Sequence, residues 1–190
     1  MADLSAARRG PLDGFTAAAP LGLAAAPATA RFILRGRPEA LAAAEPALGF
    51  SLPRDACRSA SLGERHALWL GPDEWLLIAP AREASAFGAA LEAAMGDAPH
   101  ALVDVGQRQV GLTVRGVHAA ELLSAGCPLD LDLAAFPIGR CTRTVLAKAE
   151  IVLWRTAHDQ FHIEVWRSFS AYVWRFLEAA GADFSEGEID

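Results

Sequence analysis

Two carboxylates stand at positions from which an acid or base could act on a substrate. Asp104 ends the apolar run at residues 101–105 and enters a turn at Gly106, a place where catalytic carboxylates often lie. Glu150 begins the apolar run at residues 151–154. If the fold brought the two acids together, they could share general acid and base roles. The structural alternatives are that Asp104 accepts hydrogen bonds from backbone N–H groups of its turn, which we favour, and that Glu150 is solvated.

The histidines and cysteines predict neither a metal site nor a nucleophile. His158 and His162 are four residues apart, a spacing that shares one face only on a helix, and here it straddles a predicted turn and strand. We therefore expect a solvated histidine pair. Cys57, Cys127 and Cys141 show no C-x-x-C spacing and are predicted to be reduced, partly buried thiols. The sequence also lacks a glycine-rich phosphate loop and a G-x-S-x-G nucleophile turn.

The best-defined elements around these residues are a hairpin and a helix in the last third of the chain. Residues 151–154 are apolar at every position, which predicts a strand covered on both faces. Residues 161–166 alternate, which places His162, Glu164 and Trp166 on the face that points away from the core. A helix is predicted to follow. Its expected core-facing stripe consists of Phe169, Tyr172, Val173, Phe176 and Leu177.

A similar order of strands and helices occurs earlier in the chain. Arg35, at the end of one predicted strand, corresponds to Arg115, and Trp69 corresponds to Trp154, at offsets of 80 and 85 residues. Recurrence by chance is the alternative to a duplication. We predict an α+β fold, a single domain of two similar halves, each with an antiparallel or mixed sheet and helices packed outside. The predicted halves span residues 31–105 and 109–181.

Composition and charge exclude several classes of partner. The chain of 190 residues is 53% hydrophobic, and its net charge is −6. Because its arginines are scattered, it lacks the basic surface of a protein that binds nucleic acid. No run of about 18 strongly apolar residues predicts a membrane span. The expected location is the cytoplasm.

The two ends of the chain differ in composition from the predicted domain. Residues 1–30 are rich in proline and alanine and are predicted to form a flexible arm. The Arg-Arg pair in this arm also resembles a twin-arginine signal, although prolines and Asp13 interrupt the apolar region that a signal needs. Residues 182–190 are predicted to form an acidic tail.

Tryptophans and arginines near the last predicted helix form a candidate protein interface. Trp166 lies on the outward face of its predicted strand, and Trp174 lies off the helix stripe assigned to the core. Both Trp and Arg are enriched among the residues that dominate binding at interfaces. The alternative is that the sheets of the domain itself bury these tryptophans. The candidate interface residues are Trp166, Arg167, Trp174 and Arg175.

Several stretches of the chain together resemble a known family. They are LWLGPDEWLL at residues 68–77, VDVGQR at 103–108, GCPLDL and FPIG within 122–148, and FHIEVWRSFSAYVWRFL at 161–177. Over about residues 31–181 the sequence resembles the gamma subunit of heterotetrameric sarcosine oxidase. The resemblance implies a fold similar to the folate-binding domain of aminomethyltransferases.

The resemblance also implies a role within a four-subunit enzyme. Such enzymes oxidatively demethylate sarcosine to glycine, pass the one-carbon unit to tetrahydrofolate or release formaldehyde, and reduce oxygen to hydrogen peroxide. By this resemblance, FAD, FMN, NAD and tetrahydrofolate are held by the large alpha and beta subunits, and zinc by the delta subunit. The gamma subunit is expected to pack directly on alpha. No cofactor and no catalytic residue is expected on this chain.

Two departures from the aminomethyltransferases argue against independent catalysis. Those enzymes have a D-V-S-H turn, whereas this chain reads D-V-G-Q from Asp104. They also have paired aspartates after a glycine-rich segment, whereas residues 149–150 read A-E without the preceding glycines. A lone Glu150 is poorly suited to orient a folate amine. A free-standing folate-dependent enzyme that uses Asp104 and Glu150 is therefore the alternative function, and a non-catalytic subunit is the favoured one.

Overall fold

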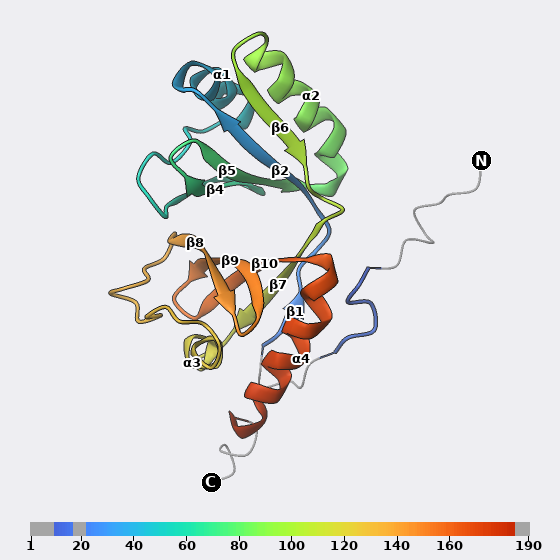
Figure 1. The fold of residues 1–190 in the computed structure, drawn as a ribbon, viewed down its shortest axis with the longest axis vertical. Helices are drawn as coiled ribbons and strands as arrows, with labels where there is room; N and C mark the ends of the chain where they lie inside the picture. Colours follow the sequence, from blue (N-terminus) through green and yellow to red (C-terminus); the bar gives the residue numbers. More distant parts are fainter. Residues whose placement is uncertain (1–9, 17–21, 185–190) are drawn as a thin grey trace, which may run out of the picture.

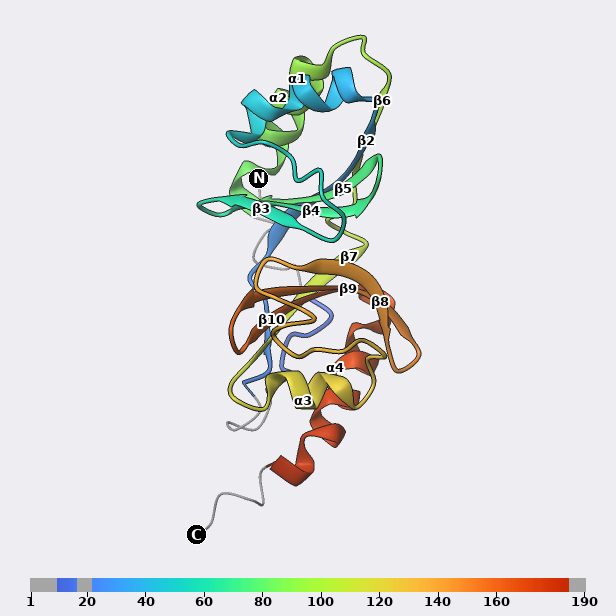
Figure 2. The ribbon, with the colours of Figure 1, turned by 90° about the vertical axis from the view of Figure 1, so that its left-hand side faces the viewer.

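Two sheets pack face to face between two pairs of helices (Figures 1 and 2). The structure, a computed structural model, describes residues 10–16 and 22–184. Positions 1–9 and 17–21 of the predicted arm, and positions 185–190 of the predicted acidic tail, lie outside the described residues. The layers run helices, sheet, sheet, helices along the long axis of the molecule (Figure 2).

The first sheet is built from the first half of the chain. Its strands are antiparallel, and helices from the same half cover its outer face and close a core around Leu34, Trp75 and Leu91 (Figure 1). The elements are β2 (Thr29–Gly36), α1 (Pro38–Leu48), β3 (Ser59–Leu62), β4 (Arg65–Gly71), β5 (Glu74–Pro80), η2 (Ala81–Glu83), α2 (Ala84–Met95) and β6 (His100–Asp104). The strand order is β3-β4-β5-β2-β6.

The second sheet repeats this plan with the second half of the chain. It is also antiparallel, and its outer face closes a core around Leu112, Phe161 and Ile163. The elements are β1 (Ala24–Ala25), β7 (Gln109–Arg115), α3 (Ala119–Ser124), β8 (Cys141–Leu146), β9 (Ala149–Ala157), β10 (Gln160–Trp166), η3 (Arg167–Phe169), α4 (Ser170–Ala180) and η4 (Ala182–Phe184). The strand order is β1-β7-β10-β9-β8. The predicted α+β fold of two similar halves is confirmed.

A third core lies between the two sheets. Leu76 from β5 meets Val152 and Trp154 from β9 there, and the remaining members are Leu68, Ile78, Val105 and Cys141. Ile151 and Leu153 point the other way, into the core beneath the helices. The prediction that residues 151–154 are covered on both faces is confirmed, because their strand lies in the middle of the layered stack.

Part of the segment predicted to be a flexible arm completes the second sheet. Ala24 and Ala25 pair with β7, and Arg115 donates its backbone N–H to Gly22 O at 3.1 Å. The side chains of Leu12 and Leu23 are buried in the second core. Within the described residues, the second half of the molecule therefore includes a segment that precedes β2 in the chain. The predicted second half, residues 109–181, does not include that segment.

The orientation of α4 agrees only in part with the predicted one, since Val173 and Leu177 are buried as predicted and Phe176 packs against the second core. Its buried side chains are Val173, Trp174 and Leu177, together with Ser170, whereas Phe169 and Tyr172 are exposed. The residues before Ser170 form the 3₁₀ turn η3, so Phe169 precedes the α-helix and does not share its buried face. Phe15, from the N-terminal segment, packs edge-on against Trp174 with ring centroids 5.7 Å apart. The N-terminal segment therefore covers Trp174, a contact that the spacing of apolar residues in α4 does not predict.

Helix α1 also runs further than its sequence suggests. Pro46 is expected to end the helix, because proline has no backbone N–H to donate to the carbonyl four residues earlier. The helix instead continues to Leu48, which is fully buried. Gly49 then ends it in the left-handed conformation, with φ of 88° and a hydrogen bond to Glu45 O. Packing of the last turn offsets the hydrogen bond lost at the proline.

Candidate functional site

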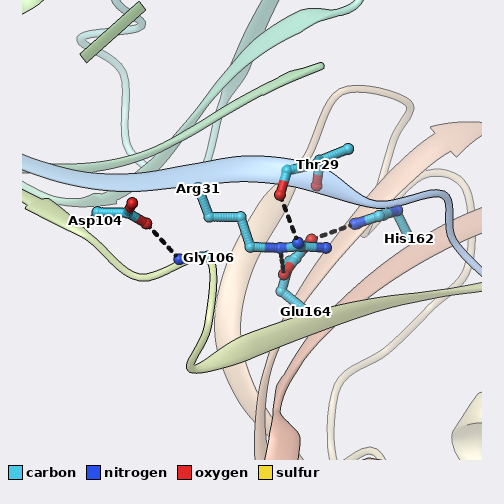
Figure 3. Close-up of polar contacts among 6 residues, drawn as sticks. All are labelled: Thr29, Arg31, Asp104, Gly106, His162 and Glu164. Atoms are coloured by element: carbon cyan, nitrogen blue, oxygen red, sulfur yellow. Dashed lines mark hydrogen bonds and ion pairs between the residues drawn. The ribbon is translucent and has the colours of Figure 1, made fainter. Parts of the chain in front are cut away.

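Asp104 is an exposed residue whose carboxylate belongs to its own turn. Its Oδ1 accepts a hydrogen bond from the backbone N–H of Gly106 at 2.8 Å (Figure 3). This arrangement confirms the structural interpretation of Asp104, because the carboxylate stabilises the turn between the two halves. In Figure 3 the side chain lies apart from the polar cluster formed by Arg31, His162 and Glu164.

Glu150 and Asp104 face different cavities. Glu150 is exposed near the start of β9 and lines a pocket of about 450 Å³ between the two sheets. Asp104 lines a second pocket, of about 700 Å³, beside residues 10–13 and 25–31. The structure therefore does not bring the two carboxylates together, and they do not form an acid–base pair.

A buried polar cluster of Arg31, His162 and Glu164 joins the two sheets. Arg31 Nε lies 2.6 Å from Glu164 Oε2, and His162 Nε2 lies 2.7 Å from Glu164 Oε1 (Figure 3). Arg31 also donates to the backbone oxygen of Thr29 at 3.1 Å. Glu164 is 1% exposed, so its charge is compensated inside the protein rather than by water. Both carboxylate oxygens are engaged.

The electrostatics of the cluster favour an ionised Glu164. Burial by itself would raise the pKa of Glu164, because a carboxylate loses hydration in a dry interior. The hydrogen bond from His162 and the positive charge of Arg31 outweigh this effect, and the pKa of Glu164 is lowered. A carboxylate held in this way is a poor general base. The cluster is an electrostatic link between β2 and β10.

The sequence interpretation missed this cluster and was wrong about His162. His158 is exposed, but His162 is partly buried and bonded to Glu164, so the two do not form a solvated pair. The prediction treated the second face of β10 as solvent-facing, whereas the first sheet covers it. The position of Glu164 in a strand of two stacked sheets could have revealed the ion pair. Both faces of such a strand are buried, so an acid there needs a partner of opposite charge.

The described residues offer no metal site, and the thiol of Cys141 is not activated. Within residues 10–16 and 22–184, no group of three or more His, Cys, Asp or Glu side chains could hold a metal ion. Cys57, Cys127 and Cys141 are free thiols, the last two buried. Burial raises the pKa of Cys141 to about 12, which is the opposite of what a nucleophile needs. No helix in the same part of the chain is long and apolar enough to cross a bilayer.

The candidate interface is partly rearranged by the orientation of α4. Trp166 is 44% exposed, and Arg167 and Arg175 are exposed as well. Trp174 is 1% exposed and belongs to the core, so its prediction as a surface residue is wrong. Phe169 and Tyr172 provide exposed aromatic rings instead. We call the following set the aromatic surface: Trp166, Arg167, Phe169, Tyr172 and Arg175.

Comparison with known proteins identifies the family. A model of the family described as "Sarcosine oxidase, gamma subunit family" matches residues 35–183. The sarcosine oxidase gamma subunits of an Arthrobacter species and of Corynebacterium sp. strain P-1 are 34% and 35% identical to this chain over 149 residues, which are 78% of this chain and 72% of each relative. The chain belongs to the sarcosine oxidase gamma subunit family.

Solved structures agree with this family in fold. A chain of the heterotetrameric sarcosine oxidase from Corynebacterium sp. U-96, solved in complex with pyrrole 2-carboxylate, superposes with a TM-score of 0.88 at 30% identity, covering 97% of this chain and 100% of that one. The glycine cleavage system aminomethyltransferase T from Bartonella henselae superposes with a TM-score of 0.67 at 20% identity, covering 84% of this chain and 45% of that one. The fold predicted by resemblance to aminomethyltransferases is confirmed.

Proposed function

We propose that this chain is a non-catalytic subunit that supports the larger subunits of a heterotetrameric sarcosine oxidase. The observation that carries the proposal is the superposition on a complete chain of the Corynebacterium complex, at a TM-score of 0.88. The separation of Asp104 from Glu150 also supports a structural role, because the chain does not assemble the acids that could act on a substrate. The complex would demethylate sarcosine oxidatively to glycine, with tetrahydrofolate and oxygen as co-reactants.

The proposed complex places the cofactors on the other subunits. In this proposal the chain packs directly on the alpha subunit, and the beta and delta subunits belong to the same assembly. FAD, FMN, NAD and tetrahydrofolate would be held by the large subunits and zinc by delta. The residues present here do not fit folate, since Glu150 lacks the paired acid and the glycine-rich segment of the aminomethyltransferases. The complex is proposed to act in the cytoplasm.

The aromatic surface is the proposed contact with the partner subunits. Trp166, Phe169 and Tyr172 expose large aromatic rings close together in the chain, and the exposed Arg167 and Arg175 accompany them. This composition matches that of interface centres. Trp174 is buried and is therefore not a proposed contact residue. It anchors α4, the helix that carries the exposed Tyr172 and Arg175.

Co-expression with the large subunits tests the proposal. A tagged form of this chain should recover the large subunits together with their flavin absorption, and the chain alone should neither turn over sarcosine nor show a flavin spectrum. Arg167→Ala should weaken recovery of the large subunits. Failure to recover them under conditions in which each is folded would overturn the proposed function. Normal recovery with Arg167→Ala would remove that residue from the interface.

Calorimetry with tetrahydrofolate tests the alternative of a free-standing folate enzyme. No observation on the molecule favours it, and we expect no heat of binding to the isolated chain. Micromolar binding that is lost in Asp104→Asn would instead favour this alternative over a purely structural role.

A further inference from the structure

Strand β6 has an edge with which no strand of the described chain pairs. It is the last strand in its sheet, and its other edge pairs antiparallel with β2, with Val103 opposite Ile33. Val105 donates its backbone N–H to Arg31 O at 2.8 Å, which fixes the hydrogen-bonding phase of this ladder. Because that phase alternates along an antiparallel pair, the backbone N–H and C=O groups of Leu102 and Asp104 point away from β2. They form a short template for another strand.

A cleft lined by both apolar and charged side chains opens beside this edge. Val103 and Trp166 both line the 450 Å³ pocket between the two sheets. Val103 is 53% exposed and Trp166 is 44% exposed, so two sizeable apolar side chains from different sheets face solvent across one opening. The pocket is continuous with the aromatic surface, because Trp166 belongs to both.

The charges in the cleft leave one cation available. Arg143 pairs with Glu74, and Glu164 pairs with Arg31. The guanidinium of Arg108 lies 5.5 Å from the centre of the Trp166 ring, and among the described residues no carboxylate forms an ion pair with it. The remaining charge that lines the pocket is the exposed carboxylate of Glu150. This cation–π contact leaves the guanidinium of Arg108 able to bind a carboxylate from outside the chain.

We propose that an extended segment of another subunit of the oxidase adds to the β6 edge as a further strand. Main-chain hydrogen bonds to Leu102 and Asp104 would supply affinity, as in other cases of strand addition. On the side of the cleft, the segment carries an apolar residue between Val103 and Trp166 and an acidic residue at Arg108. These two residues are separated by one position, because alternate side chains of a strand share a face. The proposal rests on the proposed function, since the segment comes from a partner subunit.

Hydrogen–deuterium exchange tests the strand addition in the assembled oxidase. Peptides that cover residues 100–105 should exchange at least tenfold more slowly in the complex than in the chain alone, because the amides of Leu102 and Asp104 gain partners. The matched control is β3, the opposite edge strand of the same sheet, whose exchange should not change. A complex that forms with unchanged exchange in β6 overturns the strand addition and leaves the proposed function intact. Failure of the complex to form overturns both.

Lysine substitutions at two side chains of similar exposure, one in each edge strand of the sheet, distinguish the two edges by their effect on binding to the other subunits. Val103→Lys places an ammonium in the cleft and should weaken binding to the other subunits at least tenfold. Leu62, in β3, is 56% exposed and serves as the control, so Leu62→Lys should bind as the unmodified chain does. Arg108→Glu should weaken binding and remove its salt dependence. Equal affinities for the two lysine variants contradict the proposal.

Hydrogen exchange of the chain alone tests whether a second copy of this chain occupies the edge instead. Protection of residues 100–105 that rises with the concentration of the chain alone would assign the edge to such a copy and would also contradict the proposal.

Discussion

Glu164 joins the two halves of the molecule through a buried ion pair. Its carboxylate is buried between Arg31 and His162, on strands from different sheets. Glu164→Gln should lower the free energy of unfolding by about 3–5 kcal/mol, because Arg31 is left as an uncompensated buried charge. Urea unfolding followed by tryptophan fluorescence measures the loss. Glu150→Gln, at an exposed carboxylate, is the matched control and should leave the urea midpoint unchanged.

The same carboxylate makes stability depend on acid pH. The pKa of Glu164 in the folded chain lies below its ordinary value of 4.5, so the unfolded chain takes up the proton first as the pH falls. The stabilisation is therefore complete above about pH 4.5 and is lost as the pH drops toward the folded pKa. Unfolding midpoints measured between neutral and acid pH should fall steeply for the natural chain and less steeply for Glu164→Gln. Parallel curves would contradict the assignment.

Cys141 illustrates how burial removes reactivity from a thiol. Its sulfur is fully buried between the sheets, and burial raises its pKa to about 12. Alkylation at neutral pH should therefore modify Cys57, which is half-buried, well before Cys141. Peptide mass spectrometry after timed exposure to iodoacetamide measures the two rates. Modification of Cys141 that precedes unfolding, at a rate close to that of Cys57, would contradict the proposed burial.

At the scale of single elements, the orientation of α4 buries Trp174, whereas Trp166, at the end of β10, stays at the surface. Trp174→Ala should destabilise the fold by about 3–5 kcal/mol, because it removes a buried ring and leaves a cavity against Phe15. Trp166→Ala should change stability by less than about 1 kcal/mol, since that ring is half exposed, and should weaken subunit assembly instead. Thermal unfolding and co-purification measure the two effects separately. Equal losses of stability in both variants would show that the orientation of α4 is wrong.

Local sequence patterns predict the strands and turns of this chain well. They predict poorly which faces of those elements are buried by distant parts of the chain. The apolar run at residues 151–154 and the turn at Asp104 follow from neighbouring residues alone, and both are confirmed. The burial of Trp174 and Glu164 depends instead on chain far away in sequence, namely Phe15 and Arg31. Neither contact leaves a periodic signal. The same holds for the candidate site, where the two acids were chosen from local context and only the fold shows that they lie apart.

At the scale of the whole molecule, the two halves are similar but not independent. β1 precedes β2 in the chain, yet it pairs with β7 in the second sheet. The middle core takes Leu76 from one sheet and Val152 from the other. Arg31 supplies the counter-charge for Glu164 across the same boundary. We therefore expect the two halves to unfold as one cooperative unit, although their repeat is visible in the sequence.

Cutting the chain at the connection between the halves tests this interdependence. Fragments 1–106 and 107–190 should each fail to unfold cooperatively when alone. The second would lack the β1 edge and Leu23, and it would hold Glu164 without Arg31. Mixing the fragments in equal amounts should restore near-ultraviolet circular dichroism and a single transition. A matched mixture in which the second fragment carries Glu164→Gln should recover less, because Arg31 then enters the middle layer unpaired. Cooperative unfolding of fragment 107–190 by itself would show instead that the second half carries its own complete core.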